Sequence, residues 1–182
     1  MNKNSKIIIG IIVVICVVLT AGVLYGYVGS SSFYANMANI SAEEKLAYIS
    51  VDDAVSENVT NPVDIIEEEN DYIISLNESI KKLDGSKWMI QNETIKQYID
   101  LEITQRQNQI KLCKDIIELN NIKQEYNADH FGYGQYKLQV DTAMDKINET
   151  KKSVDTTKDM KKQLLNAHSD IKSQLKSAGV DV

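Results

Sequence analysis

The residues that could do chemistry are few, and their spacing does not fit a metal site. The densest group is the acidic run Glu67-Glu68-Glu69, followed by Asp71. Carboxylates at consecutive helical positions point in different directions around the helix, and no calcium-loop spacing or loop glycine accompanies this run. A di-metal helical bundle would need a glutamate three residues before a histidine, and neither histidine of the chain has one. The sequence therefore predicts no metal and no cofactor.

Nucleophilic catalysis is also not indicated. Cys16 lies inside an apolar segment and Cys113 lies far along the polar part of the chain, so the two are not expected to pair. Free cysteine is usually buried, and Cys113 is expected to behave as a small core residue. No serine has the sequence context of an activated nucleophile, and His168 falls on an apolar stripe where a packing role is expected. The chain is predicted not to be an enzyme.

One segment interrupts the helical pattern in the second half of the chain. It spans residues 127–134 and combines a histidine with several aromatic rings. His130, Phe131, Tyr133 and Tyr136 form the candidate interaction turn. A small ligand or a partner surface would be sought here first, because aromatic side chains supply large contact areas. Trp88, near a predicted helix start, is expected to anchor the core or an end of the bundle.

The charge distribution argues against nucleic acid as a partner. The net charge is −6, and residues 41–84 carry twelve acidic residues against three lysines. A protein that binds phosphate backbones normally presents a net basic surface. We therefore predict no nucleic-acid partner.

Residues 7–28 are 22 uncharged, largely apolar residues and predict a single transmembrane helix. At about 1.5 Å per residue this stretch is long enough for a hydrocarbon core of about 30 Å. Lys3 and Lys6 precede it, and no positive charge follows before Lys45. The positive-inside bias places residues 1–6 in the cytoplasm and everything after residue 28 outside. The lipid bilayer is thus an expected partner.

A cleaved signal peptide is the alternative, because small residues follow Val28. Signal-peptide cores usually span about 7–15 residues, which favours an anchor. Under either interpretation, the remainder of the chain is expected to be exported.

Five Asn-x-Ser/Thr sequences follow the apolar segment, and they are candidate N-glycosylation sites in an exported protein. They begin at Asn39, Asn58, Asn77, Asn92 and Asn148. The Asn-, Ile- and Lys-rich composition is typical of an AT-rich prokaryotic genome. A prokaryotic surface glycoprotein would be consistent with both features.

The remaining chain predicts an all-α fold, since a single proline and few glycines leave little material for turns. Residues 29–40 are expected to form a juxtamembrane joint and residues 41–182 a helical bundle. The expected helices cover residues 33–60, 62–84, 86–126 and 135–178. Asn61-Pro62 is a strong N-terminal signal, and Gly85 a C-terminal one.

The last predicted helix carries the most sustained heptad-like stripe, with a polar middle at Thr150, Thr157 and Lys161. Polar seam residues lower stability but fix register and partner number. The full stripe is Val140, Ala143, Ile147, Thr150, Val154, Thr157, Lys161, Leu164, His168, Ile171, Leu175 and Ala178.

Two assemblies fit these lengths. In the favoured one, residues 33–84 form one long arm kinked at Pro62, and two further helices complete an antiparallel three-helix, coiled-coil-like rod. This rod returns the 130–136 turn to the membrane, where its aromatic rings could contact headgroups. In the alternative the chain reverses at Pro62, which gives a four-helix bundle with the turn at the far end.

The sequence favours a membrane-anchored, surface-exposed structural or interaction module that binds a protein partner or self-associates through its helical seam. The alternative is a small-ligand-binding bundle that serves as accessory to a separate transducer, with its site at the 130–136 turn.

Overall fold

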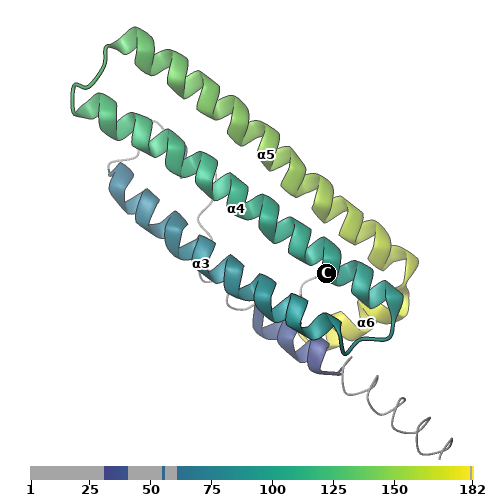
Figure 1. Cartoon of the computed structure of the whole chain (residues 1–182). Coiled ribbons are helices and arrows are strands. Elements are labelled where there is room, and N and C mark those ends of the chain that lie inside the picture. The colour runs from purple at the N-terminus through teal and green to yellow at the C-terminus, as the bar shows by residue number, and fades with distance from the viewer. Residues whose placement is uncertain (1–30, 41–54, 56–60, 181) are drawn as a thin grey trace, which may run out of the picture.

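The computed structural model describes residues 31–40, 55, 61–180 and 182, and this part of the chain is an all-α bundle (Figure 1). Three long helices run antiparallel: α3 (Pro62–Lys87), α4 (Glu93–Asn127) and α5 (Tyr133–Ala167). The middle one is α4, and a short helix, α6 (Ser169–Ser177), turns back beneath the end of α5. The predicted all-α helical bundle is confirmed for these residues.

None of the helices in the described ranges is long and apolar enough to cross a membrane. The predicted span at residues 7–28 and the predicted cytoplasmic residues 1–6 lie outside those ranges. The membrane anchor therefore stays a prediction.

Residues 31–40 are helical and belong to the bundle. Phe33, Met37 and Ile40 are at most 1 % exposed, and they pack in one cluster with Leu83 of α3 and Tyr98 of α4. The spacing i, i+4, i+7 places these three apolar side chains on one face of the helical segment. The sequence predicts a joint at residues 29–40 and a helix that begins at residue 33; residues 31–40, the described part of this region, are helical throughout.

The same cluster rules out the three-helix rod. In a continuous helical arm, Leu83 would follow Phe33 by 50 residues, a span of roughly 75 Å. Phe33 and Leu83 instead share one cluster, so residues 31–40 and α3 do not form one continuous arm. At Asn61, the extended backbone (φ −144°, ψ 99°) and the side-chain oxygen that accepts from the Val63 N–H are the features of a helix start, and α3 begins at the next residue. Of the two predicted assemblies, only the alternative does not require residues 33–84 to form one arm.

Two helix boundaries differ from those expected. The α3 helix continues past Gly85 to Lys87, and Ser86 is buried with its hydroxyl donating to the Leu83 carbonyl. Ser86 therefore does not cap the next helix. Asn92 does so instead, because its Oδ1 accepts from the backbone N–H groups of Thr94 and Ile95.

The expected helix over residues 135–178 is broken at His168, whose backbone (φ −130°, ψ 75°) separates α5 from α6. The break lets Ile171 and Leu175 reach the cluster that contains Phe33. Burial of these two side chains offsets the loss of helix continuity, at about 1.5–3 kcal/mol for each large apolar side chain. The predicted stripe over residues 140–178 nevertheless lies inward, since each of its members is buried or half-buried.

The described core is divided along the bundle. We call the end that holds Phe33, Leu83, Leu165 and Leu175 the base, and the end that holds the α4–α5 connection the tip. A second apolar cluster fills the tip half, and its buried members are Leu112, Ile116, Leu119, Ala143, Ile147 and Val154. Between the two clusters the α4–α5 contact is polar.

Candidate functional site

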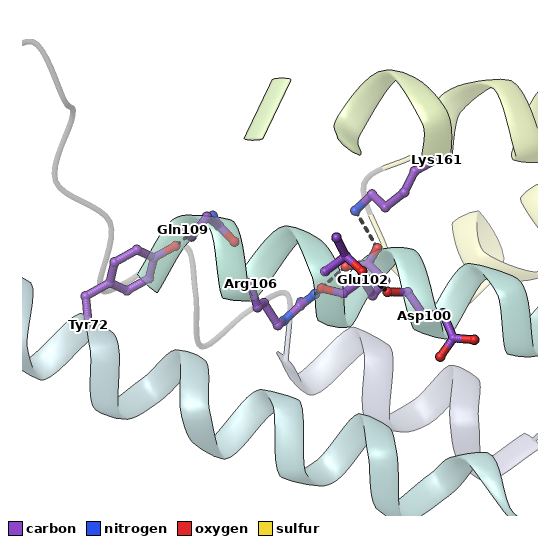
Figure 2. Close-up of polar contacts among 7 residues, drawn as sticks. Tyr72, Asp100, Glu102, Arg106, Gln109 and Lys161 are labelled. Carbon is purple, nitrogen blue, oxygen red and sulfur yellow. Dashed lines mark hydrogen bonds and ion pairs between the residues drawn. The ribbon is translucent and has the colours of Figure 1, made fainter. Parts of the chain in front are cut away.

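A buried ionic cluster occupies the gap between the two apolar clusters (Figure 2). Glu102 on α4 accepts from Arg106, one turn further along the same helix, and from Lys161 on α5. Glu102 and Arg106 are 3 % and 2 % exposed, and the Lys161 ammonium also lies 5.8 Å from the centre of the Tyr98 ring. Both oxygens of the carboxylate are therefore paired with cations inside the bundle.

The protonation of Glu102 follows from these partners. Burial alone would raise its pKa, but the charges of Lys161 and Arg106, together with hydrogen bonds from Lys161 and Tyr98, outweigh burial. The net effect lowers the pKa of Glu102 below its ordinary value, so the group is a carboxylate at neutral pH.

Further polar pairs continue the α4–α5 contact toward the tip. The Asn108 amide donates to the Thr157 hydroxyl at 3.1 Å, and the Thr150 hydroxyl donates to Asp115 at 2.7 Å. Each of the three polar seam positions predicted on α5 thus meets a polar partner on α4. A shift of register would leave these buried groups unpaired, which costs about 1–3 kcal/mol for each. The pairs therefore fix how α5 lies on α4.

The α3–α4 contact contains a second buried carboxyl group. Glu69 is 3 % exposed, and burial raises its pKa, an effect opposed by a hydrogen bond with Cys113 and reinforced by the charge of Glu68. Burial and the neighbouring Glu69 raise the pKa of the Cys113 thiol far above its ordinary value. Because the thiolate is the reactive form, Cys113 behaves as the core residue that was predicted.

The predicted interaction turn is a compact aromatic unit at the tip. Tyr126 stacks on Tyr136 with ring centroids 4.2 Å apart, and Phe131 and Tyr133 lie 6.3 and 6.4 Å from these two rings, respectively. Asp129 adopts φ 57°, a left-handed conformation that aspartate tolerates better than most residues. Stacking holds the turn, while Tyr133 remains 66 % exposed.

This turn lies at the opposite end of the bundle from residues 31–40 (Figure 1). The placement expected from the three-helix rod, with the turn beside the chain's entry into the bundle, is therefore wrong. The reason is that Phe33 and Leu83 lie in one cluster, so residues 31–40 and α3 do not form one continuous arm. His130 is exposed at the same tip, and Leu138 adds an apolar side chain that is 68 % exposed.

A groove of about 940 Å³ lies at the base and not at the predicted turn. It is lined by Tyr34 of the N-terminal segment, Asn92 before α4, and Asp170 and Gln174 of α6. Among the described residues, the buried Tyr34 hydroxyl has no hydrogen-bond partner, and burial followed by the charge of Asp170 raises the pKa of Tyr34.

The candidate glycosylation sites are distributed over the surface. Asn39, Asn77, Asn92 and Asn148 are exposed, and Asn58 lies outside the described residues. Trp88, expected to be an anchor, is 71 % exposed in the α3–α4 connection. Over the described ranges, no group of three or more acidic, histidine or cysteine side chains could hold a metal ion.

Sequence reasoning missed two features. The Glu102–Arg106 pair has a local signal, since opposite charges four residues apart face each other on a helix, but nothing local marks the pair as buried. The groove is lined by side chains from three segments that are distant in sequence, so no residue spacing predicts it. Comparison of the chain with protein-family models, with curated proteins and with solved structures gives no match.

Proposed function

We propose that this chain is a membrane-anchored, surface-exposed interaction module: a helical stalk that holds an aromatic contact surface away from its point of attachment. The observation that carries this proposal is the placement of the 130–136 turn at the end opposite to residues 31–40. If residues 7–28 span the membrane, the bundle is attached at its base. The 35-residue helices α4 and α5 then carry the tip roughly 50 Å outward.

Two properties of the tip support contact with a partner protein. Its rings are held in place by stacking, so binding them costs little conformational entropy. Tyr133 and Leu138 are both about two-thirds exposed, and exposed tyrosine is enriched at protein interfaces. The polar pairs between α4 and α5 keep the two helices that carry the tip in one register.

Site-specific photocrosslinking tests this proposal. A benzoylphenylalanine placed at Tyr133 in native membranes should capture a protein partner, whereas the same probe at Trp88 should not. Trp88 is the matched control because it is similarly exposed, at 71 %, but lies at the base. A partner captured only from position 88, or none from position 133, would contradict the proposal.

The groove at the base favours a second function, a small-ligand-binding bundle that serves as accessory to a separate transducer. Tyr34, Asp170 and Gln174 provide a ring, a carboxylate and an amide around one concave surface. Ligand-dependent increases in Tm that disappear in Asp170→Ala would support this function. A ligand effect that is unchanged by that substitution would show that the groove is not the binding site.

A further inference from the structure

Three of the candidate glycosylation sequences lie entirely within the described residues, and their local structures differ. Asn77 lies in the middle of α3 and Asn148 in α5, so both sequences are helical throughout. Asn92 precedes the first residue of α4 and has an extended backbone (φ −74°, ψ 114°). An acceptor asparagine must be reached together with the hydroxyl two residues later, which is why such sites belong to surface loops.

The hydroxyl groups at the two helical sites are not accessible in the folded chain. Ser79, which completes the Asn77 sequence, is 0 % exposed. Thr150, which completes the Asn148 sequence, is 1 % exposed and donates to Asp115 at 2.7 Å. The Asn77 amide nitrogen also donates to the Ile73 carbonyl at 2.8 Å. Modification at either site requires local unfolding of a long helix.

The Asn92 sequence has none of these obstacles. Asn92 is exposed, and within the described part of the chain its side chain is bonded through Oδ1, as the cap of α4. Thr94 is half-buried and not fully enclosed. Asn92 is also one of the residues that line the groove at the base.

We propose that Asn92 is the N-glycan acceptor that stays available after the chain has folded. In this reaction a bond forms between Asn92 Nδ2 and C1 of the first sugar, while the bond from C1 to the phosphate of a lipid-linked oligosaccharide breaks. The phosphate leaves with the electron pair, and Nδ2 loses one proton. Because Oδ1 is not changed, the cap of α4 survives the modification.

The occurrence of this glycan in the cell rests on the proposed export of the bundle. The preference for Asn92 over the two helical sites does not depend on export, so it can be measured with purified protein. Evidence against export would therefore leave this preference unaffected.

The test uses the full chain carrying Asn39→Gln and Asn58→Gln, so that only the three compared sites remain. It is incubated with a single-subunit oligosaccharyltransferase that accepts Asn-x-Ser/Thr and with a lipid-linked oligosaccharide, and each site is quantified by peptide mass spectrometry. Folded protein should be modified at Asn92 at least about tenfold faster than at Asn77 or Asn148, because these two need a helix to open. Three synthetic peptides, each with one of the sequences, should react at similar rates.

Matched variants distinguish the role of Asn92 as glycan acceptor from its role as the cap of α4. Asn92→Asp keeps an oxygen cap and Thr94→Ala keeps Asn92 itself, and both should abolish the glycan while circular dichroism stays unchanged. Thr94→Ser should retain it. Comparable modification of Asn77 or Asn148 in the folded chain, or failure of Asn92 to react in either the protein or its peptide, would overturn the proposal.

Discussion

Replacement of Glu102 by leucine should lower the free energy of unfolding by about 3–5 kcal/mol, the range for breaking a buried ion pair from one side. The substitution leaves Arg106, 2 % exposed, without the carboxylate that it now faces, and it also unpairs Lys161. The cost comes from the charges left behind in the core and not from the loss of packing. Chemical unfolding followed by circular dichroism measures it.

The matched control removes the whole cluster. The triple variant Glu102→Leu, Arg106→Leu, Lys161→Met carries no buried charge at these positions and should recover most of the lost stability, because apolar replacement of a buried ionic cluster is often neutral or stabilising. The prediction would be contradicted by a triple variant as unstable as Glu102→Leu, or by a single variant whose free energy of unfolding lies within about 1 kcal/mol of that of the native chain. Either result would show that unpaired buried charge does not determine the stability of this region.

The same variants carry a pH signature. The folded-state pKa of Glu102 lies below its unfolded value, so between the two values the unfolded chain binds more protons. The stabilisation from Glu102 is therefore fully present above the unfolded pKa and is lost as pH falls through the folded one. The triple variant should lose less stability on acidification than the native chain. An identical acid dependence would contradict the assignment.

Replacement of Phe33 by alanine should also cost about 3–5 kcal/mol, as large core truncations do. Phe33 is 0 % exposed, and its ring meets that of Tyr98 edge-on with centroids 6.3 Å apart. A residue in a juxtamembrane joint would show almost no effect. The prediction therefore tests whether residues 31–40 are part of the folded base.

Asn39→Ala is the control for Phe33→Ala because Asn39 is exposed on the same helical segment. It should change the free energy of unfolding by less than about 0.5 kcal/mol. Both values come from urea unfolding. Equal effects of the two substitutions, or a loss of less than about 1 kcal/mol for Phe33→Ala, would place the segment outside the core.

Local signals predicted much of the fold. Asn61 and Pro62 marked the start of α3 through cap chemistry, which depends only on neighbouring residues. The α5 stripe predicted the inward face correctly, including Thr150 and Thr157, because helical periodicity does not depend on which helix is the partner.

Features that depend on distant contacts were not predictable in this way. The direction of residues 31–40 is set by the packing of Phe33 against α3 and α4, and the break at His168 is set by the burial of Leu175 in the same cluster. Neither contact has a local pattern. The groove at the base is also formed by residues that are distant in sequence. The 130–136 turn was recognisable because its aromatic rings are close in sequence.

The proposed function requires the tip to face the exterior while the N-terminal end of the bundle stays at the membrane. The direct measurement is the labelling of Tyr133→Cys with a membrane-impermeant maleimide, in a Cys113→Ala background, on intact and on permeabilised cells. Equal labelling is expected in both, because the proposed topology places the exposed Tyr133 outside the membrane. Labelling that appears only after permeabilisation would contradict it.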